Sequence, residues 1–152
     1  MADRRRRIKP VEDQAQDFGR VRDDHSSEIA EDYVELIADL LDTTGDVRAV
    51  DLAQRFGVTP ATVNNTVKRL IRDGMVRSER YRAIFLTEAG RALAERCRKR
   101  HRIVRDFLIA LGVDPVIAES DAEGIEHHVS DETLAAFARH LRPAKGESSS
   151  AR

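Results

Sequence analysis

The chain has 152 residues, of which 41% are hydrophobic, 5% aromatic and 35% charged, a composition that favours one or two small helical domains with charged surfaces. Its single cysteine, Cys97, excludes an intramolecular disulfide framework and a cysteine-rich zinc site. No apolar run approaches the roughly 18 residues of a membrane-spanning helix, and the basic residues 4–7 are not followed by the apolar stretch of a signal peptide, so we expect a cytoplasmic protein.

The formal net charge of −1 conceals a strong segregation of charge along the chain. Residues 55–105 carry fourteen basic and four acidic side chains, whereas residues 11–54 carry three and thirteen, and residues 106–141 carry one and eight. A basic block of this kind is expected where a protein contacts phosphates. The acidic blocks on either side of it can supply ligands to a cation.

Residues 1–24 are polar and without periodicity, which predicts a disordered basic extension. This extension could add nonspecific affinity for DNA, or it could be a solvated tail without a role; the sequence favours neither interpretation. A helix is expected to begin near Ser26 or Ser27, either of which can cap it, and to end before Gly45. Its apolar stripe comprises Ile29, Tyr33, Leu36, Ile37 and Leu40.

Residues 50–73 predict a helix-turn-helix. A short helix over 50–56 is followed by Gly57 for a tight turn, by Thr59 as a helix cap and by Pro60 at the first helical position. The inward face of the second helix comprises Val63, Val67, Leu70 and Ile71. The outward face suits a recognition helix, because small residues permit close approach while amide and basic side chains reach bases and phosphates. Its predicted DNA contacts are Thr59, Ala61, Thr62, Asn65, Lys68, Arg69 and Arg72.

Two short strands, in residues 75–79 and 83–86, predict a β-wing. Arg80 and Arg82 at its tip would reach the DNA backbone or a narrow minor groove. The helix-turn-helix and wing together predict a winged helix-turn-helix DNA-binding domain over residues 25–90.

Residues 91–142 predict a second, helical domain, followed by a Ser-rich tail over 143–152 that we expect to be disordered. Thr87 can cap a long helix that runs to about Leu111. The apolar stripes of residues 103–111 and 134–141 are expected to form the dimer interface. Asp114-Pro115 begins a short helix, Ser120 the next, and Ser130 caps the last one.

Glu123, Glu126 and His127 follow i, i+3, i+4 spacing, so on a helix they share one face and could hold a divalent metal. Other interpretations exist for each residue taken singly. Ser120 and Glu123 match a capping box, Glu126 could be solvated, and the adjacent histidines could be structural.

Further ligands must come from elsewhere, because one helix face offers three at most. Asp32 and Glu35 are spaced i, i+3 on the first helix, where acids also suit the helix start. His101 lies on an apolar stripe, where a histidine is more often a core residue than a ligand. A carboxylate-rich set of this kind suits Mn²⁺ or Fe²⁺ better than a structural zinc site.

The order of helix, helix-turn-helix, wing, long helix and Glu123-Gly-Ile-Glu-His-His resembles the diphtheria toxin repressor family, over about residues 26–141. Within that family the chain is similar to the manganese transport regulators. Three further motifs carry this resemblance: Asp32-Tyr-Val-Glu35, Leu86-Thr-Glu-Ala-Gly90 and Arg100-His101. The resemblance implies a mainly α fold, an N-terminal winged helix-turn-helix with a small β-wing plus a C-terminal helical dimerisation and metal-binding domain. It also implies the manganese ligands Asp32, Glu35, His101, Glu123, Glu126 and His127, with two ions per subunit.

We therefore expect a homodimeric, manganese-responsive repressor, not an enzyme, that binds near-palindromic double-stranded DNA and controls manganese uptake and homeostasis genes. Neither a membrane nor an organic cofactor is expected. An Fe²⁺-responsive repressor of the same family is the alternative. A winged-helix regulator of a small organic ligand and a phosphoester-cleaving metalloenzyme are the rival classes. Stoichiometric Mn²⁺ binding would distinguish the metal-responsive regulator from the regulator of a small organic ligand.

Overall fold

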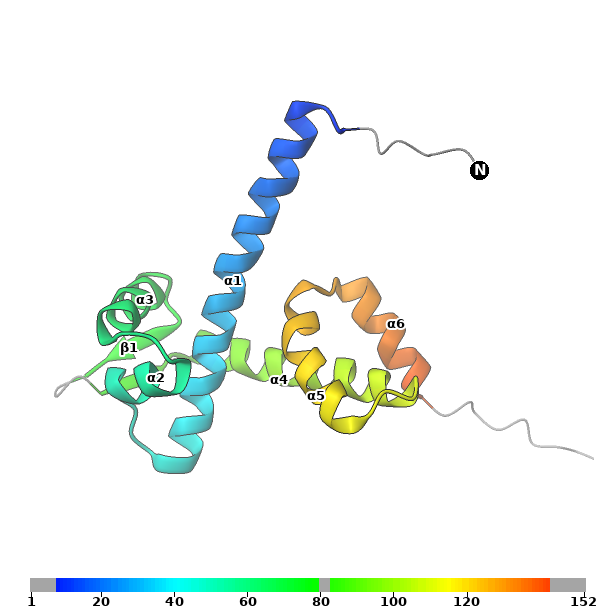
Figure 1. Cartoon of the computed structure of the whole chain (residues 1–152). Coiled ribbons are helices and arrows are strands. Elements are labelled where there is room, and N and C mark those ends of the chain that lie inside the picture. Colours follow the sequence, from blue (N-terminus) through cyan, green and yellow to red (C-terminus); the bar gives the residue numbers. More distant parts are fainter. Residues whose placement is uncertain (1–7, 80–82, 143–152) are drawn as a thin grey trace, which may run out of the picture.

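The computed structural model describes residues 8–79 and 83–142, which form a mainly helical protein with one small sheet (Figure 1), as predicted. Its elements are α1 (Val11–Thr44), α2 (Ala49–Phe56), α3 (Pro60–Arg72), β1 (Val76–Ser78), β2 (Ile84–Leu86), α4 (Glu88–Ala110), α5 (Pro115–Ile125), the 3₁₀ turn η2 (Glu126–His128) and α6 (Asp131–Leu141).

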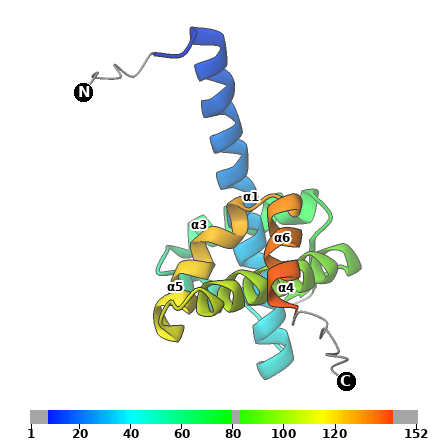
Figure 2. The same ribbon diagram turned by 90° about the vertical axis from the view of Figure 1, so that its right-hand side faces the viewer.

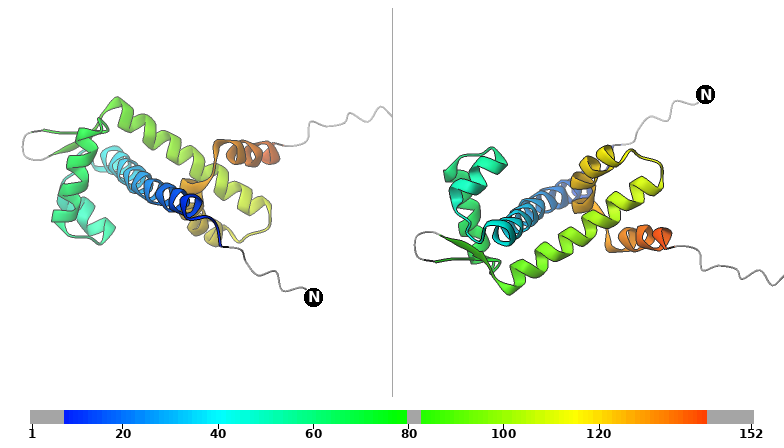
Figure 3. Two further views of the ribbon diagram at one scale, coloured as in Figure 1. Left: turned by 90° about the horizontal axis from the view of Figure 1, so that it is seen from above. Right: turned by 90° about the horizontal axis from the view of Figure 1, so that it is seen from below.

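Two groups of elements are joined by α1 and α4. The helices α2 and α3 and the hairpin lie on one side of the C-terminal half of α1, and α5 and α6 lie at the far end of α4 (Figure 1). Seen from above and below, α4 passes beside α1 before it reaches α5 and α6 (Figure 3). Among the described residues, no helix is long and apolar enough to cross a membrane.

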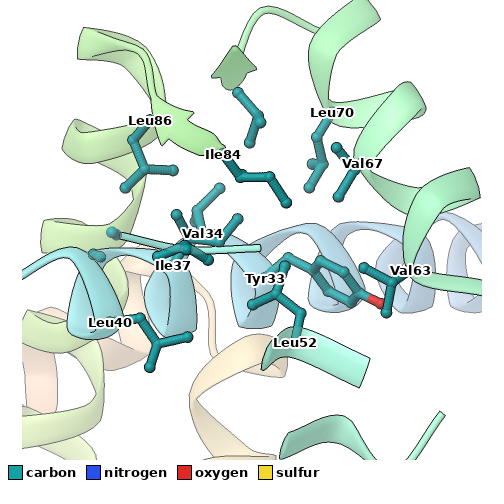
Figure 4. Packing of buried hydrophobic residues seen from close by; sticks show 14 of the residues in the cluster. Tyr33, Val34, Ile37, Leu40, Leu52, Val63, Val67, Leu70, Ile84 and Leu86 are labelled. Atoms are coloured by element: carbon teal, nitrogen blue, oxygen red, sulfur yellow. The ribbon is translucent and has the colours of Figure 1, made fainter. Parts of the chain in front are cut away.

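The main hydrophobic core lies where α1 meets the helix-turn-helix and the hairpin. Val34 and Ile37 of α1 are fully buried, as are Leu52 of α2 and Val63 of α3 (Figure 4). Tyr33 stacks on Phe56 with ring centroids 4.4 Å apart. The apolar stripe of α1 thus packs as its i, i+3, i+4 pattern predicts, and it ties α1 to the DNA-binding domain.

The first helix begins at Val11, well before the predicted start near Ser26 or Ser27. Residues 11–24 are therefore helical, and the prediction of a disordered extension is wrong for them; residues 1–7 lie outside the described part of the chain. Acids in the first turn, Glu12 and Asp13, suit the positive end of the helix dipole. Lys9 also pairs with Asp17 at 2.5 Å across that start.

The helix-turn-helix forms as predicted. Gly57 ends α2 with a left-handed φ of 65°, and the Thr59 hydroxyl accepts a hydrogen bond from the backbone N–H of Thr62 at 3.2 Å, directly before Pro60. Val63, Val67 and Leu70 are buried as expected, but Ile71 is 42% exposed. The buried face of α3 is therefore one residue narrower than predicted, and Ile71 instead lines a surface hollow with Ala49 and Ile84.

The wing strands pair antiparallel, with Val76 opposite Leu86, and its predicted tip contacts Arg80 and Arg82 lie outside the described residues. The start of α4 is fastened to this hairpin. The Thr87 hydroxyl accepts from the Gly90 N–H at 3.1 Å and donates to the Gly74 carbonyl at 2.6 Å. Gly90 is required there, because a Cβ at that position would meet the Met75 carbonyl oxygen at 2.0 Å.

One prediction about the C-terminal domain needs correction. A single helix, α5, runs from Pro115 through Ser120, so Ser120 begins no helix and caps nothing; the cap is Asp114, which accepts from the N–H groups of the first turn. The stripes of 103–111 and 134–141 meet within one chain, where Phe107 stacks on Phe137 with centroids 3.9 Å apart. Ser130 caps α6 as predicted.

Candidate metal centre

Histidine and carboxylate side chains gather where α1, α4, α5 and η2 meet. Asp32 and Glu35 come from α1 and His101 from α4. Glu123 lies on α5, whereas Glu126 and His127 lie on the 3₁₀ turn that follows it. The helical i, i+3, i+4 face predicted for the last three residues is therefore broken after Ile125, and it is the turn that directs the last two inward.

Glu126 lies at the centre of this cluster and is 1% exposed. Its Oε2 is 3.5 Å from His101 Nδ1, and its Oε1 is 3.5 Å from His127 Nε2. Neither carboxylate oxygen has a hydrogen-bond partner among the described residues. A buried carboxylate without partners is costly, which is the pattern expected of a group that awaits a cation.

His127 is held between two carboxylates of α1. Its Nδ1 lies 2.7 Å from Glu31 Oε2, and its Nε2 lies 3.1 Å from Asp32 Oδ1. A metal-binding histidine characteristically donates its other ring N–H to a carboxylate, which fixes the ring. Glu31 occupies that position, and it leaves Nε2 facing Asp32 and Glu126.

His101 has carboxylates on both of its ring nitrogens. Nε2 lies 2.9 Å from Glu119 Oε1, and Nδ1 lies 3.7 Å from Glu123 Oε1. These three residues can place one ligand atom each within 4.8 Å of one another. Glu119 was absent from the predicted ligands, although its i, i+4 spacing to Glu123 is a signal that could have found it.

Glu35 faces the same centre. With Asp32 and Glu123 it lines a cavity of about 370 Å³ between α1, α2 and α5. Burial raises the pKa of Glu35, and the charges of Glu123 and Asp39 raise it further. All six predicted ligands therefore surround one region, with Glu35 and Asp32 at its edge nearest the DNA-binding domain.

The close packing of acidic side chains in this cluster shifts the pKa values of its members. Burial raises the pKa of Glu126 to about 8, and the neighbouring charge of Glu35 adds to the shift. Burial lowers the pKa of His127, but its hydrogen bonds to Asp32 and Glu31 outweigh this and raise it to about 10. Protons thus hold together a set of donors that would otherwise repel, and a divalent cation could replace them.

Arg100 braces the turn that carries Glu126 and His127. Its guanidinium donates to the backbone carbonyl of Glu126 and lies 3.5 Å from that of Val129, and it also lies 3.7 Å from Glu31 Oε1. The carboxylates and imidazoles present, with the unpartnered oxygens of Glu126 among them, fit a Mn²⁺ or Fe²⁺ centre by the chemistry of their donors.

The predicted DNA-contacting side chains of α3 share its outer face. Those of Thr59, Ala61, Thr62, Asn65, Lys68 and Arg72 are exposed, and Arg69 is half-buried. The Thr59 and Thr62 hydroxyls lie 3.0 Å apart, so part of their hydrogen-bonding capacity is used in capping. Asn64, which was not predicted, is also exposed on α3.

Comparisons with known proteins match both halves of this structure. The N-terminal DNA-binding domain of iron-dependent repressors matches residues 25–84, and their metal-binding and dimerisation domain matches residues 87–145. The transcriptional regulator MntR of Escherichia coli O6:H1 is 50% identical over 127 residues, which are 84% of this chain and 82% of that protein. The HTH-type regulator MntR of Listeria monocytogenes serotype 4a is 40% identical over 100 residues, 66% of this chain and 70% of the relative.

Among solved structures, a manganese-dependent transcriptional repressor in complex with manganese is 32% identical, with a TM-score of 0.66 over 74% of this chain and 52% of that one. The chain therefore spans about half the length of that repressor. The fold and the site define a winged-helix DNA-binding protein with a metal-binding and dimerisation domain. The chain belongs to the iron-dependent repressor family, that of the diphtheria toxin repressor, which confirms the resemblance drawn from its motifs.

Proposed function

We propose that this protein is a manganese-responsive transcriptional repressor, which binds operator DNA as a homodimer and controls genes of manganese uptake and homeostasis. The observation that carries the proposal is the buried carboxylate of Glu126, unpartnered among the described residues and placed between His101 and His127. The names of the MntR relatives and of the manganese-dependent repressor support the same metal.

The donor set favours manganese. Asp32, Glu123 and Glu126 supply hard oxygen atoms, which suit Mn²⁺ better than soft sulfur ligands would. Burial, with the charge of Glu31, raises the pKa of Cys97 to about 12, so that thiol stays protonated and offers no thiolate. Fe²⁺ takes similar ligands and is the alternative.

Two ions per subunit are supported by the arrangement around Glu126. One of its oxygens faces His127, which lies beside Asp32, and the other faces His101, which lies beside Glu123. Glu126 therefore has one carboxylate oxygen available to each of two groups of donors. We infer that Asp32 and His127 would hold one ion and that His101 and Glu123 would hold the other, each pair together with an oxygen of Glu126.

The switch follows from where the donors originate. Asp32 and Glu35 lie on α1, whose opposite face packs into the DNA-binding core, whereas the remaining donors lie on the dimerisation side. When bound, Mn²⁺ supplies the positive charge that offsets repulsion among these carboxylates. Asp32 and Glu35 then hold α1 against α4 and α5, which sets the spacing of the two recognition helices for successive major grooves of a near-palindromic operator.

The proposal is tested by operator binding with and without Mn²⁺ for wild type and Glu123→Ala. Wild type should bind at least about 10-fold more tightly with Mn²⁺, a typical coupling between sites, and Glu123→Ala should lose most of that gain. Asp121→Ala, which removes an exposed acid from the same helix, is the matched control and should keep it. Equal affinity in all conditions would refute the switch.

A further inference from the structure

The N-terminal arm, defined as Ile8–His25, is the part of the structure that the proposed function leaves unexplained. It comprises residue 8 to the middle of α1 and stands clear of both domains (Figures 1 and 2). The side chains of Ile8, Val11, Phe18 and Val21 are 87%, 78%, 57% and 60% exposed. The buried residues of α1 begin only at Glu31.

The arm nevertheless carries an apolar stripe. Val11, Ala15, Phe18 and Val21 recur at steps of three and four, and the same stripe continues to Ile29, which packs against the core. Such a stripe marks the face of a helix that is covered. A row of exposed large apolar side chains along a helix is typical of an interaction surface, so an arm with this pattern calls for a partner.

The charge of the arm selects among partners. Residues 8–25 hold five acidic and three basic side chains besides His25, and this net negative charge disfavours both DNA and an anionic membrane surface. An apolar stripe bordered by acids suits another protein surface.

The position of the arm points to a second copy of this chain. The arm leaves the body beside the dimerisation domain, where Glu28 Oε2 lies 3.4 Å from His128 Nε2. The same domain leaves large apolar side chains uncovered, since Leu111, Val116 and Ile117 are 58%, 76% and 53% exposed. A second copy bound at this domain meets the arm where it emerges. The helical part of the arm, residues 11–25, is about 22 Å long at about 1.5 Å per residue and can reach across it.

We propose that the arm is a dimer clasp, whose stripe of Val11, Phe18 and Val21 packs on the second copy of the chain. The inference rests on the homodimer of the proposed function and goes beyond it, because it assigns part of the interface to a segment outside the dimerisation domain. The arm is continuous with Asp32 and Glu35 on α1. Holding it in the dimer therefore also steadies the helix that supplies two of the proposed metal ligands.

Phe18→Glu tests the clasp, with Gln16→Glu as the matched control, because Gln16 lies on the opposite face of the arm and gains the same charge. We expect sedimentation equilibrium to show a dimer dissociation constant raised at least about 10-fold by Phe18→Glu, as for loss of one buried aromatic side chain. Gln16→Glu should change it less than about twofold. Circular dichroism verifies that both variants keep their helix content.

Equal effects of the two variants, or no effect of either, would overturn the clasp while leaving the homodimer intact. A wild-type chain that is monomeric at all concentrations would instead refute the homodimer itself. A photo-crosslinking phenylalanine analogue at position 18 provides the second measurement. A crosslinked species of twice the chain mass, absent for the same analogue at position 16, supports the clasp, and a crosslink to operator DNA contradicts it.

Discussion

At the scale of single residues, the candidate metal centre contains a buried carboxylate that destabilises the metal-free protein. Glu126 is buried between two histidines with neither oxygen hydrogen-bonded among the described residues. Glu31 and Arg100 fix the geometry without belonging to the predicted ligands. The Glu126 carboxylate therefore favours metal binding but lowers the stability of the metal-free protein.

Glu126→Gln should stabilise the metal-free protein and abolish metal binding. Burial raises the pKa of Glu126 from 4.5 to about 8, so its contribution to stability is fully present below pH 4.5 and is lost as pH rises through 8. The amide does not ionise, and the difference between variant and wild type should grow to about 4 kcal/mol near pH 8. Urea unfolding from pH 5 to 8.5 in chelator measures it; a difference independent of pH would contradict the assignment.

Glu31→Ala should weaken Mn²⁺ binding about 10- to 100-fold, the usual effect of losing the carboxylate that orients a histidine ligand. Glu31→Gln retains an oxygen that can accept from His127 Nδ1 and should lose less. Calorimetry gives the affinities. The ¹⁵N shifts of His127 in the Zn²⁺-loaded protein report whether Nε2 is still the bound nitrogen. Unchanged affinity in Glu31→Ala would show that the ring is positioned without Glu31.

At the scale of elements, helix boundaries set by local signals were predicted correctly, whereas two other helix starts were not. Thr59, Thr87 and Ser130 cap the helices that they were expected to cap, because a cap needs only its own first turn. Ser120 failed as a cap because Asp114 and Pro115 start the helix earlier, and no residue between them and Ile125 ends it. The start of α1 was misplaced because the helical spacing of Val11, Ala15, Phe18 and Val21 is sparse among polar residues, and because no capping side chain marks the start at Pro10.

The junction of α4 with the wing provides a prediction about an element. Gly90→Ala places a Cβ against the Met75 carbonyl and should destabilise the protein by about 1–3 kcal/mol, as overpacking does. Gly124→Ala is the matched control within α5, where a Cβ meets nothing within 4 Å, and it should be neutral or stabilise by up to about 1 kcal/mol. Urea unfolding of the metal-free protein distinguishes them. Comparable stabilities of the two variants would show that α4 can shift away from the hairpin.

At the scale of the whole molecule, α1 is shared by every proposed activity. It packs into the DNA-binding core, supplies Asp32 and Glu35 to the centre and carries the N-terminal arm. In the proposed mechanism, metal, operator and second subunit therefore all act on one helix, and their effects should be coupled.

The coupling is reciprocal by thermodynamic necessity. If Mn²⁺ raises operator affinity by a given factor, saturating operator DNA should raise Mn²⁺ affinity by the same factor. Chelation should lower the melting temperature of the protein alone, since metal binds the folded state only. Fluorescence anisotropy at fixed free Mn²⁺ and metal titration of the DNA complex measure the two factors. Unequal factors would mean that a further equilibrium, such as dimer dissociation, intervenes.

The amino-acid sequence by itself determined the order of the elements, the helix-turn-helix and the six candidate ligands. Periodicity, caps and motif spacing act over one or two turns, and the motifs match a known family. Only the tertiary structure decided how those ligands meet. Glu119 and Glu31 joined the cluster because α5 and α1 pack beside α4, and Glu126 was singled out because burial leaves its oxygens without partners among the described residues. Burial and proximity between distant segments are properties of packing, which local spacing does not encode.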